Sequence, residues 1–136
     1  MAEAHRTVAA RRPLLWLAFA LGVASVAPSL AAASTVAVTI GEHGEDADAC
    51  PSLGELRAAT VLRAGPSSQS PAIATLPRGA RLHLCIDAAD GRWVGVVVAA
   101  DADDCGVSAA VPRPRRYRGP CRAGWLPVRS VRVIAG

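Results

Sequence analysis

Polar and apolar residues alternate through the middle of the chain in the pattern of a β-strand. Residues 81–86 place an apolar side chain at every second position, which predicts a strand with one buried face. The dipeptide Asp90-Gly91, which favours tight hairpin turns, comes next and is followed by the apolar run 93–98. We therefore predict two antiparallel strands joined by a turn.

Shorter apolar segments on either side of this hairpin complete an all-β pattern. Residues 59–62 form the first of them, and residues 125–128 and 131–134 form the last two. The stretch 66–71, rich in serine and proline, is expected to be a surface loop. The core candidates of the first half are Ile73, Leu76, Leu82, Leu84 and Ile86.

Residues 1–33 have the organisation of a secretory signal peptide. Three arginines precede residue 13, an uncharged apolar run fills residues 14–27, and alanines at 31–33 suit cleavage. The apolar run is shorter than the roughly 20 residues that a spanning helix needs, although an uncleaved anchor stays an alternative. We expect an exported protein, periplasmic or extracellular, with no stable membrane anchor after cleavage.

Cleavage would leave a small domain with little net charge. Residues 34–40 are β-branched enough to form a strand, but the acidic stretch that follows them has the composition of a solvated linker. We therefore assign 34–49 to a linker and 50–136 to a domain. Removing three arginines and one acid lowers the net charge from +4 to about +2. This excludes a general polyanion binder, and we expect no nucleic-acid partner.

Four cysteines follow the signal segment, an arrangement that predicts disulfides in an exported chain. Of the three possible connectivities we favour Cys105 with Cys121, and Cys50 with Cys85, whose side chain is expected on the outer face of its strand. Closing the first of these loops is worth on the order of 3 kcal/mol. A metal site is the alternative, but ligand pairs such as CxxC are absent. We expect no metal and no cofactor.

The sequence offers no complete set of catalytic groups. His83 is expected on the same strand face as Cys85, and cysteine peptidases use a Cys-His pair, but no peptidase motif is present. Asp101, Asp103 and Asp104 suggest part of a calcium loop without its glycine and closing glutamate. We expect a non-catalytic protein.

Three segments resemble the bacterial SH3 (SH3b) domain: residues 62–84 (LRAGPSSQSPAIATLPRGARLHL), 91–93 (GRW) and 124–126 (GWL). The resemblance covers roughly residues 56–134 and implies an all-β, small SH3-like barrel. It also implies a module that binds cell-wall peptidoglycan or envelope peptides. SH3b domains have a short turn where this chain has residues 99–123, which we interpret as a disulfide-closed insertion.

The insertion carries the most distinctive candidate binding residues. Clustered arginines can clasp carboxylates or phosphates with paired hydrogen bonds, although such a run can also be a solvated loop that pairs with the acids at 101–104. Trp93 and Trp125 are each either core residues or ligand contacts. If the cell wall is the ligand, the contact face comprises the loop 65–71 with Trp125, Tyr117, Arg113, Arg115, Arg116 and Arg118.

A protein partner is the alternative to a cell-wall ligand. The closed insertion would then project from the domain as the contacting element. In that case the domain is a protein-protein interaction module, or an accessory or inhibitory subunit of an envelope enzyme.

Overall fold

The computed structural model describes residues 13, 19–27 and 34–136, and the chain divides into compact units at residues 1–30 and 31–136. Residues 19–27 form neither a helix nor a strand. Most of the predicted signal peptide, 1–33, lies outside the described residues. Within the part of the chain that is described, no helix is both long and apolar enough to span a membrane.

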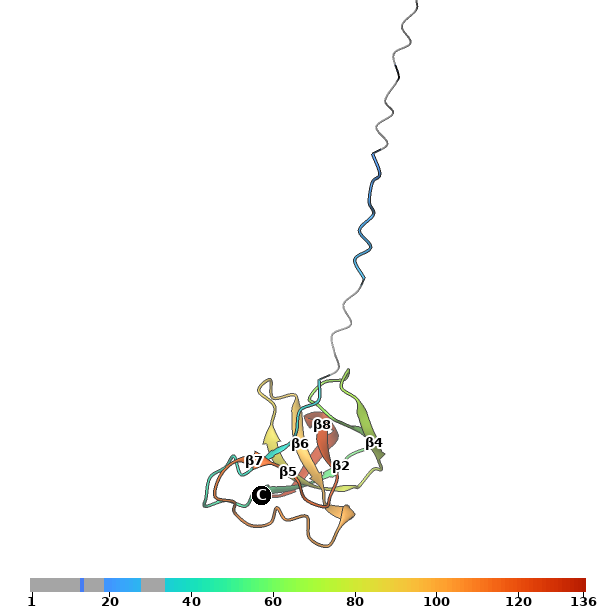
Figure 1. The fold of residues 1–136 in the computed structure, drawn as a ribbon. Coiled ribbons are helices and arrows are strands. Elements are labelled where there is room, and N and C mark those ends of the chain that lie inside the picture. Colours follow the sequence, from blue (N-terminus) through green and yellow to red (C-terminus); the bar gives the residue numbers. More distant parts are fainter. Residues whose placement is uncertain (1–12, 14–18, 28–33) are drawn as a thin grey trace, which may run out of the picture. The chain divides into compact units, whose positions relative to one another are not determined.

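The second unit is built of antiparallel strands and two short 3-10 helices, as the predicted all-β class requires (Figure 1). One sheet has seven strands in the order β4-β3-β8-β6-β5-β2-β9, and β1 pairs with β7 in a separate ribbon. The elements are β1 (Thr39–Ile40), β2 (Ser52–Leu56), β3 (Thr60–Arg63), β4 (Ala72–Leu76), β5 (Arg81–Asp87), β6 (Trp93–Val98), η1 (Ala99–Asp101), β7 (Arg115–Arg116), β8 (Ala123–Pro127), η2 (Val128–Ser130) and β9 (Val131–Ala135).

One face of the sheet encloses an aliphatic cluster, which we call the inner core. Leu76 of the edge strand β4 belongs to it, and Val131 of the other edge strand, β9, packs against it. The sheet therefore curves round a single core, but β4 and β9 are not hydrogen-bonded to each other. The predicted closed SH3-like barrel is not confirmed. The inner core consists of Leu56, Leu62, Leu76, Leu82, Val94, Val96, Val98 and Leu126.

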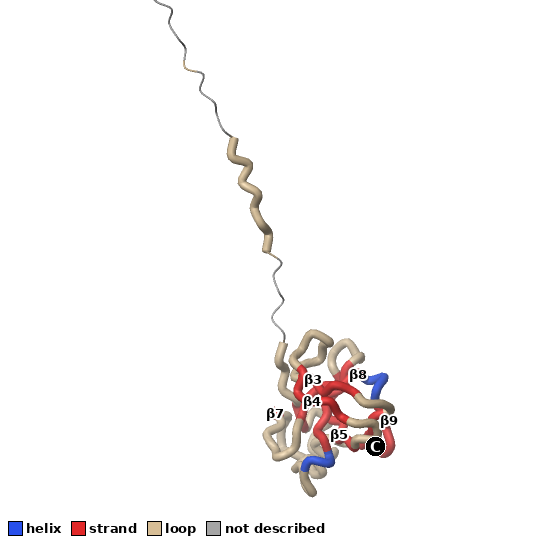
Figure 2. The backbone as a smooth tube through the Cα atoms, turned by 90° about the vertical axis from the view of Figure 1, so that its right-hand side faces the viewer, coloured by secondary structure: helices blue, strands red, loops and turns tan. Residues whose placement is uncertain are grey.

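A second cluster, the outer core, covers the opposite face. Strand β6 contributes to both, because Val96 lies in the inner core and Val97 in the outer one, and each is fully buried. Burial on both faces explains why residues 93–98 are apolar without alternation. Many of the loops lie on the side of the strands where β7 is found (Figure 2). The outer core consists of Val38, Ile40, Ala49, Cys50, Cys85, Val97, Cys105, Val107, Val111, Cys121 and Trp125.

Residues 34–40 belong to the folded unit, so their assignment to a linker is wrong. Strand β1 pairs with β7, and Val38 and Ile40 are only 3% and 2% exposed. The backbone N–H of Val36 donates to the carbonyl of Ala64 at 2.8 Å. The β-branched side chains of this segment form a strand because a complementary apolar face is available to bury them.

Strand β5 departs from its predicted pattern near its end. A register shift between Leu84 and Ile86 interrupts the β5–β6 pairing, and Ile86 packs against the outer core whereas Leu84 packs against the inner one. The predicted core positions of Leu76 and Leu82 are confirmed, at 1% and 0% exposure. Ile73 is 43% exposed on the edge strand β4, so its predicted core position is wrong.

Both disulfides have the favoured pairing and lie within the outer core. Cys50 is bonded to Cys85, and Cys105 is bonded to Cys121. The first bond ties the residues before β2 to the outer face of β5, and the second closes the insertion. Two disulfides indicate an oxidising environment, as expected for an exported protein.

Ile40→Ala should lower the free energy of unfolding by about 2–5 kcal/mol, because it opens a cavity in the outer core. Val36→Ala is the control: this side chain is 42% exposed, and its loss should cost less than about 0.5 kcal/mol. Chemical denaturation followed by tryptophan fluorescence measures both values. Equally small effects would contradict a structural role for residues 34–40.

Replacing Cys105 and Cys121 together by alanine should lower the free energy of unfolding by about 3 kcal/mol through the added freedom of the open loop. Amide hydrogen exchange should then rise within residues 99–123 and stay slow in β3 and β8, which border the inner core. Loss of protection throughout the sheet would show instead that the inner core does not hold without this bond.

Candidate functional site

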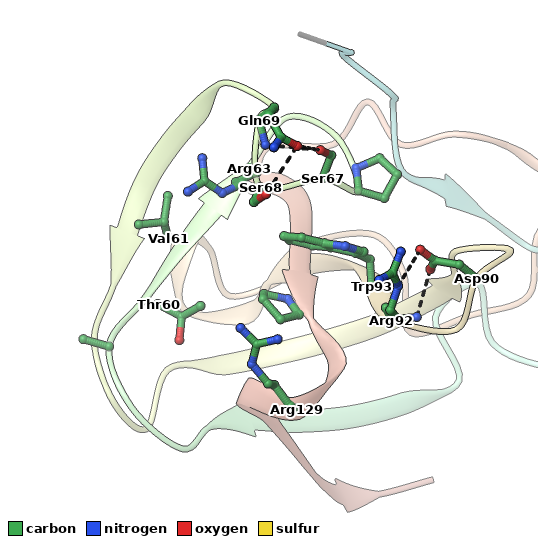
Figure 3. A pocket seen from close by; sticks show the side chains of 13 residues that line it. Thr60, Val61, Arg63, Ser67, Ser68, Gln69, Asp90, Arg92, Trp93 and Arg129 are labelled. Atoms are coloured by element: carbon green, nitrogen blue, oxygen red, sulfur yellow. Dashed lines mark hydrogen bonds and ion pairs between the residues drawn. The ribbon is translucent and has the colours of Figure 1, made fainter. Parts of the chain in front are cut away.

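A groove of about 590 Å³ opens between the loop after β3 and the turn between β5 and β6 (Figure 3). We call it the Trp93 groove. The end of β8 and η2 supply the remaining wall through Pro127 and Arg129. Its lining combines one indole ring with hydroxyl, amide and charged groups, which suits a ligand with both polar and apolar parts. The polar lining residues are Thr60, Arg63, Ser67, Ser68, Gln69, Asp90, Arg92 and Arg129.

The predicted turn before β6 fixes the position of Trp93. Gly91 has a φ of 67°, which glycine adopts without strain, and the Asp90 carboxylate accepts a hydrogen bond from the Arg92 backbone N–H at 2.9 Å. Trp93 is half-buried: it packs against the outer core and also lines the groove. The indole is thus anchored on the protein and still available to a ligand.

The loop 64–71 forms the facing wall and is held by its own hydrogen bonds. The Arg63 guanidinium donates to the carbonyl of Ser70 at 3.0 Å. The Ser67 hydroxyl donates to the side-chain oxygen of Gln69 at 2.8 Å (Figure 3). The surface loop predicted at 66–71 is therefore an ordered wall of the groove.

Positive charge exceeds negative charge in the groove. Asp90 is its one acidic lining residue, and it pairs with Arg92 at 3.1 Å. The hydrogen bond from the Arg92 backbone, supported by one from its side chain, holds the pKa of Asp90 below its ordinary value. Arg63 and Arg129 have no ionic partner among the described residues. An anionic group on a ligand would therefore be attracted here.

Trp125 is a core residue, so its predicted place on the contact face is wrong. Its side chain lies in the outer core and the residue is 4% exposed. The indole N–H donates to the carbonyl of Val36 at 2.7 Å, which satisfies the one polar group of the ring. The tryptophan that lines the groove is Trp93. The local sequences do not reveal this difference, because each tryptophan follows a glycine by one or two positions and precedes an apolar residue.

The arginines of the insertion surround a second, separate cavity of about 370 Å³. We call it the arginine cavity. It shares no lining residue with the Trp93 groove, so the predicted single contact face divides into two sites. Arg113 is exposed but does not line the cavity. The residues that do are Ile40, Asp104, Cys105, Gly106, Arg115, Arg116, Tyr117, Arg118, Gly119 and Pro120.

Tyr117 organises the insertion. Its hydroxyl donates to the carbonyl of Cys105 at 2.8 Å and accepts from the backbone N–H of Cys121 at 3.2 Å. The phenol thus bridges the two residues that the disulfide also joins. Its backbone N–H donates to the carbonyl of Val38. The polar end of Tyr117 is used within the protein, so its role is first structural.

The acids at 101–104 do not neutralise the arginine run. Asp101 pairs with Arg122 instead: the carboxylate accepts from the Arg122 backbone N–H at 2.7 Å, from Nε at 2.9 Å and from an Nη at 2.8 Å. No ion pair joins Arg115, Arg116 or Arg118 to another described residue. The interpretation of the basic insertion as a loop paired with these acids is therefore confirmed for Arg122 and wrong for Arg115, Arg116 and Arg118.

The histidine on β5 does not add charge near the insertion at neutral pH. Burial lowers the pKa of His83 from its ordinary value of 6.5, and the nearby Asp104 carboxylate only partly opposes this. All four cysteines of the chain are in disulfides. Within the described residues, no three His, Cys, Asp or Glu side chains are grouped as metal ligands.

Comparisons with protein-family models, curated proteins and solved structures found no match.

The Asp101–Arg122 pair should stabilise the unit at neutral pH. The hydrogen bonds from the Arg122 side chain hold the pKa of Asp101 below its ordinary value of 3.8, so this stabilisation is present above 3.8 and is lost as the pH falls through the lower folded-state pKa. Asp101→Asn should cost about 0.5–1 kcal/mol at neutral pH, since the pair is near the surface, and should flatten the acid limb of the stability curve.

Asp103→Asn is the matched control, because Asp103 is exposed and has no ionic partner among the described residues. Urea denaturation over a series of pH values measures both variants. If the free energy of unfolding of Asp101→Asn fell at acidic pH as steeply as that of the original protein, the Asp101–Arg122 pair would not have the stabilising role assigned to it.

Proposed function

We propose that residues 34–136 are an exported, non-catalytic, SH3b-like binding module, and that the Trp93 groove binds cell-wall peptidoglycan or envelope peptides. The observation that carries the proposal is the groove itself, in which a half-buried indole stands among three arginines. Stem peptides of the cell wall carry carboxylates beside apolar side chains. A guanidinium can bind a carboxylate with two hydrogen bonds, while an aromatic face packs against the apolar part.

The composition of the groove supports binding over catalysis. Its lining has no cysteine or histidine, and both oxygens of its one carboxylate, on Asp90, are bonded to Arg92. A general acid or base must be able to exchange a proton with the substrate. No lining group is arranged for that, which agrees with a module that only recognises its ligand.

The resemblance to SH3b domains supports the same function. The segments that carry it, 62–84 and 91–93, supply most of the groove, including Arg63, the Ser67–Gln69 wall and Trp93. The insertion stands apart from this groove. The specificity of the module for the wall would therefore depend on the segments that carry the resemblance.

Trp93→Ala should weaken co-sedimentation of residues 34–136 with purified peptidoglycan sacculi by at least about tenfold, because it removes a central aromatic anchor. Arg129→Ala should weaken binding less, and Arg78→Ala, an exposed arginine outside the groove, should leave it unchanged. Circular dichroism establishes that each variant is folded.

The comparison is made at low and at moderate salt, because screening suppresses non-specific attraction to arginines. Binding that persists at moderate salt and depends on Trp93 supports the proposal. Absence of binding, or equal binding by all variants, would contradict it. Capture of a single envelope protein through the same groove would point instead to the protein-interaction module.

A further inference from the structure

The arginine cavity is separate from the Trp93 groove, and none of its arginines has an ionic partner among the described residues, whereas Arg92 of the groove pairs with Asp90. Three of its lining residues, Arg115, Arg116 and Arg118, carry guanidinium groups without an ionic partner in the described part of the chain. Three like charges within four residues repel one another, and nothing in the inner or outer core requires them, because all three are exposed. Packing therefore does not explain the clustered positive charges, whereas binding of an anionic ligand would.

The backbone that carries these arginines is held in place from several directions. Strand β7, which contains Arg115 and Arg116, pairs with β1. The Cys105–Cys121 disulfide closes the insertion round them, and the Tyr117 hydroxyl bridges the same two cysteines. A loop ordered before binding loses less entropy when a ligand arrives. This order distinguishes the cavity from a solvated run of arginines.

The charges of the lining indicate the kind of anion. Asp104 is the one acid among the lining residues, so three arginines and one aspartate leave a formal charge of +2. A single carboxylate would match only half of this charge and engage one guanidinium fork. A phosphate monoester near neutral pH carries nearly two negative charges and three acceptor oxygens, which several guanidinium groups can bind together.

We propose that the arginine cavity is an oxyanion site for a doubly charged phosphate group. Arg115, Arg116 and Arg118 provide the hydrogen-bond donors. Asp104 does not contribute to binding and opposes it by repulsion; its carboxylate is engaged by the Gly106 backbone N–H at 2.7 Å. The phosphate belongs either to a soluble molecule or to a lipid headgroup, since both present the same terminal group. This site is independent of the function proposed for the Trp93 groove.

An NMR titration of residues 34–136 with inorganic phosphate tests the site. The pH is slightly alkaline so that the dianion predominates, and sodium chloride keeps the ionic strength constant. Saturable shifts are expected at the amides of residues 104–106 and 115–119. Acetate, with one charge, should bind at least about fivefold more weakly. Shifts that do not saturate, or equal binding of acetate and phosphate, would overturn the proposal.

Two pairs of variants separate this site from general electrostatics. R115Q with R116Q should weaken phosphate binding at least about tenfold, since two charge-assisted contacts are lost. R57Q with R78Q removes the same charge at exposed positions outside the cavity and should change binding less than about twofold. Equal effects of the two double variants would contradict a defined site.

Removing the acid from the lining should raise the phosphate affinity, whereas removing the arginines should lower it. Asp104→Asn keeps an acceptor for the Gly106 N–H and removes the repelling charge, so phosphate affinity should rise about threefold. A structural role alone predicts no gain. An unchanged or reduced affinity in this variant would count against the cavity as the binding site.

Flotation with phosphatidylcholine vesicles, with and without phosphatidic acid, identifies the source of the phosphate. Binding to phosphatidic acid together with free phosphate indicates a headgroup, and binding of free phosphate alone indicates a soluble ligand; both support the site. Vesicle binding that persists in R115Q with R116Q would overturn it. Trp93→Ala should affect none of these measurements, so failure here is distinct from failure of the groove.

Discussion

Strand β6 is apolar on both of its faces, and the burial of the second face is the constraint on which the rest of the unit depends. The inner core takes one face, as in any curved sheet over a hydrophobic cluster. The outer face would expose Val97 and the flank of Trp93 unless another layer covered it. In a chain this small that layer has to come from segments without much regular structure. Here it comes from the N-terminal segment and the insertion.

The disulfides and a few specific hydrogen bonds fasten this layer to the sheet. Cys50–Cys85 ties the N-terminal segment to β5, and Cys105–Cys121 closes the insertion. The Trp125 N–H reaches the carbonyl of Val36 across the outer core. Short segments with little secondary structure lose much conformational entropy when they become ordered. Apolar contacts alone would offset this loss poorly. The disulfides and the buried Trp125 therefore provide the additional stabilisation.

The same layer separates the two cavities. The Trp93 groove lies between loops at the end of the sheet, where loop residues are positioned by the strands below them. The arginine cavity lies in the covering layer, where β1, β7 and a disulfide fix the backbone. One is lined by an indole and guanidinium groups, and the other by guanidinium groups and the phenol of Tyr117. The two sites can therefore be altered independently by substitution.

The sequence by itself predicted five of the seven strands of the sheet (β3, β5, β6, β8 and β9), the hairpin turn at residues 90–91 and, as the favoured choice among three, the disulfide pairing; it did not predict β2 or β4. These follow from period-two alternation, turn chemistry and the side of a strand on which a cysteine stands, all of which are local properties. It did not reveal that 34–40 forms part of a core, because a β-branched segment becomes a strand only when a distant strand and an apolar face are there to receive it.

Only the tertiary structure decided which tryptophan lines a groove and which arginines line one cavity. Trp93 and Trp125 have similar local sequences, and their roles differ because the Val36 segment covers one of them and leaves the other at the groove. Likewise, Asp101 pairs with Arg122 and not with Arg115, Arg116 or Arg118 because β6 pairs with β8, which brings the residues after β6 beside Arg122. Local patterns specify strands and turns, but the covering of a surface depends on contacts between residues far apart in the chain.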